Sequence, residues 1–253
     1  MPACENQRHH ELKRLALLWA QAQGFAAAAT EVSLPHLRFR IDVAAYRAGT
    51  RFEARNDPRL GRTRLWRVPA LGTAAVFECK QVRADFLRDS RRSTAILERL
   101  RTLHARKLRF EAALKIHYPS LRNGDSLFSE YETHDFERSG DELYLELLSQ
   151  LRTLTRQLYE QTKFEKLTRW RAANLHYLVT EPDVLHPHEI PPSWGLLIRE
   201  SGGLRLLNKP AWQEISDASR LTFLHRIAMA GTRAMNREHG VSFEHIAALR
   251  AYG

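Results

Sequence analysis

Cysteine is scarce in this sequence, and long apolar runs are missing. The 253 residues include two cysteines, Cys4 and Cys79, which are too few and too far apart for a disulfide framework or a zinc knuckle. No stretch reaches the roughly 18 apolar residues that a membrane span needs, and Glu5 to Arg8 are polar. We therefore expect a cytoplasmic protein that is neither secreted nor inserted into a membrane.

Zinc-binding spacings are also lacking. His9, His10, His186 and His188 belong to no HExxH or Cys-His pattern, so the sequence argues against a zinc site. We find no internal repeat and no segment of low complexity.

Acidic residues are outnumbered. Asp and Glu total 29 against 39 Lys and Arg, which gives a formal charge of +10 and a pI near 10.0. This balance favours polyanionic partners, with nucleic acid as the first candidate. Most of the cations are Arg, whose planar guanidinium suits phosphate oxygens and base edges, although a GC-rich genome would raise Arg equally.

Helical and strand patterns alternate along the chain. The hydrophobic fraction of 43% suffices for one large core, or for a core with one large insertion. Apolar residues recur every three or four positions in the expected helices and cluster or alternate in the expected strands. The expected helices are 9–23, one or two within 82–117, 141–168, and one from Ser216 or Asp217 to about His239; the expected strands are 30–34, 37–46, 73–79, 175–180, 195–199 and 204–207.

The segment 47–68 follows neither pattern. It holds seven arginines opposed only by Glu53 and Asp57, which predicts a solvated, positive loop. The order of elements as a whole predicts an α/β (α+β) fold: residues 1–90 and 171–253 form the core, and 91–170 form a long helical-hairpin insertion.

One buried strand carries two charges. Within 73–79 and the following lysine, Glu78 and Lys80 are two residues apart and project from the same face, while Cys79 points into apolar packing. Charges at the end of an apolar strand are costly to bury without a compensating ion or partner. Asp42, between Ile41 and Val43 on an earlier strand, would supply a third group.

These residues resemble the signature of the PD-(D/E)xK nuclease superfamily, in which an Asp on one strand is followed by Glu-x-Lys on the next. The match is Asp42 with Glu78-Cys79-Lys80, and Arg40-Ile41 stand where many members have Pro. The resemblance implies a restriction-endonuclease-like mixed sheet flanked by helices. The runs 78–89 and 190–197 also resemble the MmcB-type bacterial DNA-repair nucleases.

The resemblance implies Mg²⁺ chemistry, with Mn²⁺ able to substitute. Hard oxygen ligands hold Mg²⁺ beside a scissile phosphate, and a lysine orients the attacking water. The resemblance also implies a metal-binding Glu on the first helix, where Glu11 lies in line with the apolar residues Leu15, Leu18 and Ala22. Its carboxylate is therefore expected to face the sheet and to reach the metal. The expected catalytic residues are Asp42, Glu78, Lys80, Glu11 and Gln81; the expected metal-binding residues are Asp42, Glu78, Cys79 and Glu11; the expected DNA-binding residues are Arg40, Arg55, Arg59, Arg62, Arg64 and Arg83.

The first hypothesis is a metal-dependent DNA endonuclease acting in repair, recombination or defence. Two alternatives stay open: a non-catalytic nucleic-acid-binding module on the same scaffold, and an interaction scaffold built on the helical hairpin. Whether the DNA is duplex, single-stranded or branched, whether RNA is cut, and whether the protein dimerises are also open.

Overall fold

The structure, a computed structural model, describes residues 7–34, 39–57, 61–88, 94–117, 122–123, 133–134, 136–242 and 244. None of the helices in these ranges is long and apolar enough to cross a membrane. The elements are α1 (Gln7–Ala22), β1 (Ala27–Ser33), β2 (Arg40–Asp57), β3 (Arg62–Lys80), α2 (Arg83–Arg88), α3 (Thr94–His117), β4 (Arg122–Asn123), β5 (Thr133–His134), η3 (Phe136–Ser139), α4 (Glu142–Tyr159), α5 (Lys163–Arg169), β6 (Leu175–Thr180), η4 (Pro187–Glu189), β7 (Gly195–Glu200), β8 (Gly203–Asn208) and α6 (Asp217–Glu238).

The chain divides into two compact units. The first contains Met1–Phe86, Lys163–Leu185 and Ser193–Gly253, and the second contains Leu87–Thr162 and His186–Pro192. The predicted insertion, 91–170, differs from the second unit in two places. Helix α5 belongs to the first unit, and the segment His186–Pro192 around η4 belongs to the second.

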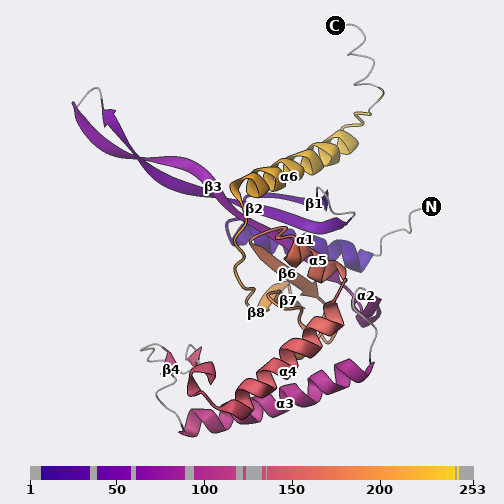
Figure 1. The fold of residues 1–253 in the computed structure, drawn as a ribbon. Helices are drawn as coiled ribbons and strands as arrows, with labels where there is room; N and C mark the ends of the chain where they lie inside the picture. Colours follow the sequence, from indigo (N-terminus) through magenta and orange to yellow (C-terminus); the bar gives the residue numbers. More distant parts are fainter. Residues whose placement is uncertain are drawn as a thin grey trace. The chain divides into compact units, whose positions relative to one another are not determined.

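The first unit is built on a six-stranded mixed sheet with the order β1-β2-β3-β6-β7-β8 (Figure 1). The strands β1, β2 and β3 form an antiparallel meander, β3, β6 and β7 are parallel, and β8 returns antiparallel to β7. Helices α1 and α6 pack on this sheet. The predicted α/β (α+β) class, with a mixed sheet flanked by helices, is confirmed.

An apolar core fills the space between α1 and one face of the sheet. Phe77 stacks on Tyr177 with ring centroids 4.9 Å apart, and Trp19 meets Tyr177 edge-on at 5.3 Å. Aromatic pairs in such geometries add stability beyond the area that they bury. The fully buried members of this core are Leu12, Ala16, Ala20, Val43, Ala45, Ala75, Phe77, Val179 and Leu197.

The second unit has a smaller core between α3 and α4. Leu114, Tyr144 and Leu148 are buried together, with Phe110 and Phe136 packed against them. Asp141 caps α4 by accepting a hydrogen bond from the backbone N–H of Tyr144 at 2.9 Å. The two predicted helical stretches of the insertion therefore pair, through α3 and α4.

The described residues of the segment 47–68 form strands and not the predicted loop. They are the distal half of the β2–β3 hairpin, paired from Gly49–Ala70 to Asp57–Arg62, and they extend from the sheet as a twisted ribbon (Figure 1). The prediction failed because the side chains of this ribbon are largely exposed on both faces. Without a buried face, a strand has no apolar alternation by which to recognise it.

A bulge separates the ribbon from the sheet. The pairing register shifts between Arg47 and Gly49, and a Cβ on Gly72 would lie 1.9 Å from the carbonyl oxygen of Arg47. The N–H of Gly72 instead donates to the hydroxyl of Tyr46 at 2.6 Å. Only glycine allows the two strands to approach this closely.

Candidate active site

Asp42 lies where the pairing between β2 and β3 ends. The paired residues run up to Val43 and Phe77, and the next residue, Asp42, uses its side chain in place of further backbone pairing. Its Oδ2 accepts the backbone N–H of Cys79 at 2.8 Å. This bond ties the Asp42 carboxylate to the middle of the Glu78-Cys79-Lys80 sequence.

Glu78 is completely buried. Its Oε2 accepts a hydrogen bond from Nζ of Lys163 at 2.7 Å, and the same ammonium donates to the carbonyl oxygen of Arg40 at 2.7 Å. Its Oε1 has no hydrogen-bond partner among the described residues. Burial and the nearby Asp42 raise the pKa of Glu78 to about 7, against the lowering effect of Lys163 and Lys80.

Asp42 has the opposite protonation behaviour. Burial would raise its pKa, but the hydrogen bond from His9, the charge of Lys163, the N–H of Cys79 and the charge of Lys80 together lower the pKa to about 2. The Nε2 of His9 is 3.6 Å from Oδ1. Two neighbouring carboxyl groups thus have pKa values that are far apart, a pattern typical of sites that divide acid and base roles.

Lys80 belongs to the same group. It is 9% exposed, its Nζ is 5.9 Å from the centroid of the Phe164 ring, and its charge lowers the pKa of both carboxyl groups. The structure therefore brings Asp42, Glu78 and Lys80 together at the carboxyl end of β3.

Glu11 does not join them, and the expectation that it faces the sheet is wrong. Its carboxylate accepts two hydrogen bonds from Arg14, both 2.8 Å long, on the surface of α1. The hydrogen bond from Arg14 lowers the pKa of Glu11. The predicted apolar stripe ran through Leu18, which is 49% exposed; the helix instead buries Leu12, Lys13, Leu15, Ala16 and Ala20.

Cys79 contributes its backbone and not its thiol. The side chain is buried in the core beneath α1, on the face opposite Glu78 and Lys80. Burial, Asp42 and Glu78 raise the pKa of the thiol well above its ordinary value, which keeps it neutral. A neutral, buried thiol is a poor metal ligand, so a metal-binding role for Cys79, which stays a prediction, would have to use its backbone carbonyl oxygen.

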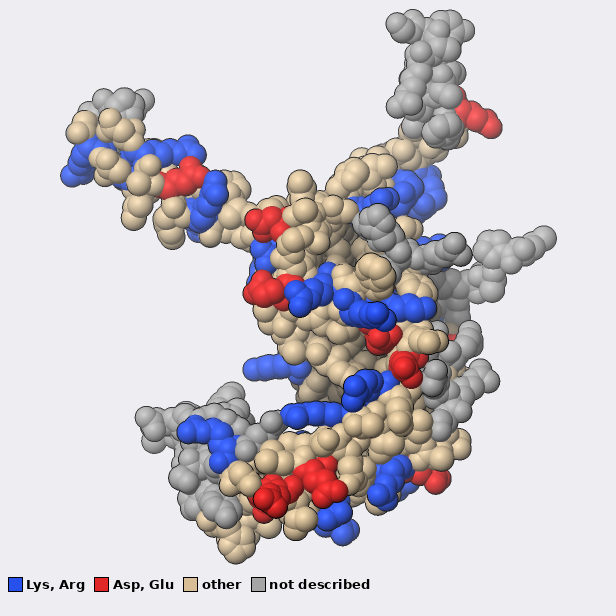
Figure 2. All heavy atoms as spheres, viewed as in Figure 1, with Lys and Arg blue, Asp and Glu red and all other residues tan. Residues whose placement is uncertain are grey.

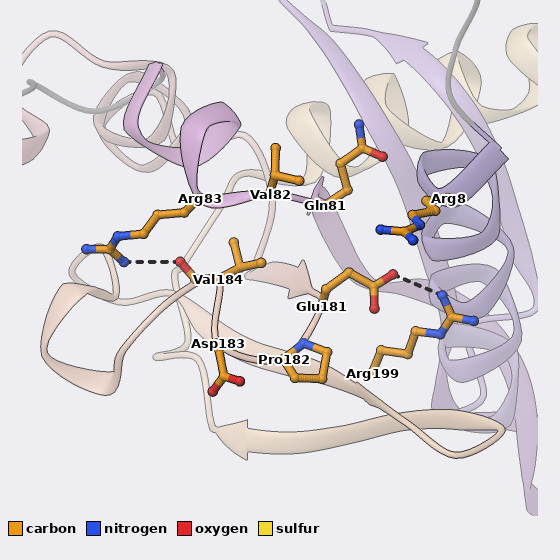
Figure 3. A pocket seen from close by; sticks show the side chains of 9 residues that line it. All are labelled: Arg8, Gln81, Val82, Arg83, Glu181, Pro182, Asp183, Val184 and Arg199. Atoms are coloured by element: carbon orange, nitrogen blue, oxygen red, sulfur yellow. Dashed lines mark hydrogen bonds and ion pairs between the residues drawn. The ribbon is translucent and has the colours of Figure 1, made fainter.

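Gln81 follows Lys80 and lines an open cavity of about 660 Å³ at the carboxyl ends of β3 and β6. Figure 3 shows Arg8 and Arg199 near Glu181 on one side of this cavity and Arg83 on the other. Arg199 pairs with Glu181 at 2.9 Å, and Arg83 donates to the carbonyl oxygen of Val184 at 3.2 Å. The cavity is lined by Arg8, Gln81, Val82, Arg83, Glu181, Pro182, Asp183, Val184 and Arg199.

The other expected DNA-binding arginines that the structure describes lie on β2 and β3. Arg40 forms an ion pair with Glu31, and Arg55 pairs with Glu53 at 2.6 Å. Arg62 and Arg64 lie on the distal ribbon, while Arg59 is outside the described residues.

Three site residues were missed by sequence reasoning: His9, Lys13 and Lys163. Lys13 is 4% exposed and forms ion pairs with Glu31 and, at 3.8 Å, with Asp42. A signal for Lys13 existed, because Ala16 and Leu17 lie three and four residues after it, on the same side of α1. Lys163 had no such signal, since it is 85 residues from Glu78 within a run of ordinary helical sequence.

The fit to a divalent cation is partial. Among the described residues, no group of three His, Cys, Asp or Glu side chains is close enough to hold a metal ion. However, Oε1 of Glu78, Oε1 of Gln81 and Oγ1 of Thr180 are buried without hydrogen-bond partners in that part of the chain. Thr180 pairs with Lys80 across β3 and β6. The residues that suit a hard cation are Asp42 and Glu78, with Glu78 offering an unpaired oxygen.

No family model matches the sequence, and no curated protein matches it. Among solved structures, the chain is similar to the SPO1766 protein of unknown function from Silicibacter pomeroyi. The TM-score is 0.45 and the sequence identity 16%, over 93% of this chain and 94% of that chain.

Proposed function

We propose that this protein is a metal-dependent phosphodiesterase that cuts DNA, with Asp42, Glu78 and Lys80 at its active centre. One observation carries the proposal: two carboxylates from neighbouring strands meet beside a lysine, and an oxygen of the buried Glu78 has no hydrogen-bond partner among the described residues. A buried polar atom of this kind calls for a ligand.

The order of the elements adds support. The PD-(D/E)xK core is a helix, a three-stranded meander, a helix and a further strand. Here α1, the meander β1–β3, α2 and β6 follow in that order, with β6 beside β3. The proposal includes this restriction-endonuclease-like core, a role in repair, recombination or defence, and a cytoplasmic location.

Each side chain has a distinct task in this proposal. A divalent cation, Mg²⁺ or Mn²⁺, would be held by Asp42 and Glu78 and would acidify a bound water and neutralise phosphate charge. Asp42, with a pKa of about 2, is ionised at neutral pH. Lys80 orients the attacking water and offsets the negative charge that builds on the phosphate oxygens. Lys163 adds a second positive charge at Glu78.

Plasmid cleavage with Mg²⁺ tests the proposal. We expect Asp42→Asn and Lys80→Ala each to slow cleavage by about 100-fold or more, with circular dichroism spectra that show the fold to be kept. Glu11→Ala should cleave at the wild-type rate, because its carboxylate lies on the surface beside Arg14. Wild-type cleavage by the Asp42 and Lys80 variants would show that the active centre lies elsewhere.

A non-catalytic nucleic-acid-binding module is the second candidate. The observation that favours it is the Lys163 ammonium, which already bonds Glu78 and the carbonyl of Arg40. A permanent ion pair with Lys163 would compensate the charge of the Glu78 carboxylate without a metal ion. Salt-dependent DNA binding, with no cleavage of plasmid, single strand, fork or RNA in Mg²⁺ or Mn²⁺, would select this candidate.

A further inference from the structure

The distal half of the β2–β3 hairpin, residues 49–57 and 62–70, is a ribbon that we call the β-arm. Within these ranges the sequence has five arginines against Glu53 and Asp57, a surplus of three positive charges. This short segment therefore holds about a third of the chain's formal charge of +10. On the face seen in Figure 2, Lys and Arg side chains gather along the ribbon.

The pairing register divides the described side chains of the β-arm between two unlike faces. Residues directly opposite in the register share a face, and neighbours along a strand alternate. One face, the basic face, carries Arg51, Glu53, Arg55, Arg62, Arg64, Trp66 and Val68. The opposite face carries Thr50, Phe52, Ala54, Asn56, Thr63, Leu65, Arg67 and Pro69.

Contacts within the basic face hold its guanidinium groups in place. Glu53 lies between Arg51 and Arg55 on β2: its Oε1 accepts a hydrogen bond from Arg51 at 2.6 Å, and its Oε2 accepts one from Arg55 at 2.6 Å. On β3, the guanidinium of Arg64 lies 5.9 Å from the centre of the Trp66 ring. Arg55 and Arg64 are directly opposite each other, so the face presents cations from both strands at fixed positions.

The dimensions of the β-arm fit a duplex. Two strands about 4.8 Å apart form a ribbon that the roughly 12 Å wide major groove of B-DNA admits. Nine paired residues at about 3.3 Å each reach about 30 Å, close to one helical turn. A surface for single strands would need several aromatic side chains on which bases stack, and Trp66 is the one aromatic residue of the basic face.

We propose that the β-arm binds duplex DNA through its basic face, with the guanidinium groups on backbone phosphates. This inference takes DNA as the partner from the proposed function and names the duplex as the form that is bound. Phe52 and Leu65, which are 69% and 71% exposed on the opposite face, point away from the DNA.

The test measures binding in EDTA, so it does not depend on cleavage. Fluorescence anisotropy with labelled duplex and single strand, over a series of salt concentrations, gives the number of phosphate contacts. We expect Arg51→Gln/Arg55→Gln/Arg64→Gln to reduce the salt slope on duplex by about 2 to 3, since each lost contact removes about 0.9. The matched control on the opposite face, Phe52→Ser/Leu65→Ser, should bind as the wild type does.

Three outcomes would overturn the inference, provided that circular dichroism shows all variants to be folded. These are an unchanged slope in the arginine variant, an equal loss on single strand and duplex, or a loss in the Phe52/Leu65 variant as large as in the arginine variant. The last outcome would place DNA, or a second copy of the chain, on the apolar face. If the wild type binds duplex DNA through the β-arm but cuts no substrate, the inference about the β-arm stands and the proposed nuclease function fails. If the protein cuts DNA and the arginine variant binds and cuts as the wild type does, the nuclease function stands and the inference about the β-arm fails.

Discussion

The ion pair between Lys163 and Glu78 couples α5 to the centre of the sheet. The two side chains are 17% and 1% exposed, and their charged atoms are 2.7 Å apart. Removal of one partner from a buried pair leaves an uncompensated charge, which costs more than the pair itself contributes. We therefore treat Lys163 as both a structural residue and a source of positive charge at the candidate site.

Lys163→Met should lower the free energy of unfolding by about 3 kcal/mol at pH 9, because Glu78, with a pKa of about 7 beside Lys163, is ionised there and loses its buried partner. Urea denaturation at pH 9 measures this loss, which should be smaller at pH 7 because Glu78 can take up a proton. Glu78→Gln/Lys163→Met is the control: it removes both charges and should recover much of the stability, so that the double-mutant cycle gives a coupling free energy. Additive losses from the two changes would contradict a direct interaction.

The sequence was sufficient to predict that Asp42, Glu78 and Lys80 lie together, but not which residues surround them. Glu-x-Lys on an apolar strand is visible locally, because charges two residues apart on a buried strand are unusual. Lys163 approaches Glu78 only through the tertiary fold, and no local pattern distinguishes it from other helical lysines. Glu11 was assigned to the wrong side of α1 because Leu15 was compatible with either of two neighbouring stripes.

His176 provides a pH dependence of stability that is separate from the candidate site. It is fully buried beside Trp194, with ring centroids 5.2 Å apart, and burial lowers its pKa to about 4. Between about pH 6.5 and pH 4 the unfolded chain binds a proton there that the folded chain does not. The stability contributed by neutral His176 is therefore complete above pH 6.5 and is lost as the pH falls towards 4.

His176→Leu should remove this part of the pH dependence. From pH 7 to pH 4, the wild type should lose on the order of 3 kcal/mol more unfolding free energy than the variant, because the unfolded chain binds a proton at His176 near pH 6.5 and the folded chain only near pH 4. Chemical denaturation at a series of pH values gives the difference. Parallel curves for the two proteins would mean that the pKa of His176 is the same in the folded and unfolded chains.

At the scale of elements, the strands that bury a face were predictable and the β-arm was not. The apolar run at 73–79 reads as a strand because it is buried on both faces, as the inner half of β3 is. The outer half of the same strand, 62–70, carries exposed Arg, Leu and Trp residues, which show no apolar alternation. Hydrogen bonds to β2 hold residues 62–70 extended. Such pairing between two strands cannot be predicted from the composition of either strand alone.

Gly72 tests how the sheet passes into the β-arm. Gly72→Ala places a methyl group 1.9 Å from the carbonyl oxygen of Arg47 and 2.4 Å from the backbone nitrogen of Gly49. Since backbone atoms cannot move aside without breaking the pairing, we expect a loss of about 3 kcal/mol or more. Gly203→Ala is the matched control, because its Cβ would have no described atom within 4 Å. Thermal melts of both variants decide, and equal melting temperatures would contradict the bulge geometry.

At the scale of the whole molecule, the predicted insertion ends at residue 170, whereas the second unit is left at Thr162 and the first unit resumes at Lys163. The chain leaves the first unit after Phe86 and returns at Lys163, before α5. The helical period runs through 141–168 in sequence, but α4 ends at Tyr159 and α5 begins at Lys163. Phe164 and Leu167 of α5 are fully buried, with Phe164 edge-on to Trp194 in the first unit. Amphipathic periodicity predicts helices but does not specify the core against which each one packs.

Two separate cores predict two separable unfolding events. Leu114→Ala empties part of the α3–α4 core, where Leu114 is 4% exposed beside Leu148, and should cost about 2 to 5 kcal/mol within the second unit. Native-state hydrogen exchange should then show faster exchange in α3 and α4, while amides of β3 and β6 keep their protection. Leu178→Ala, at a fully buried position on β6, should give the converse pattern. If either substitution accelerated exchange equally in both units, the chain would unfold as one cooperative body, and the division into two cores would have no energetic meaning.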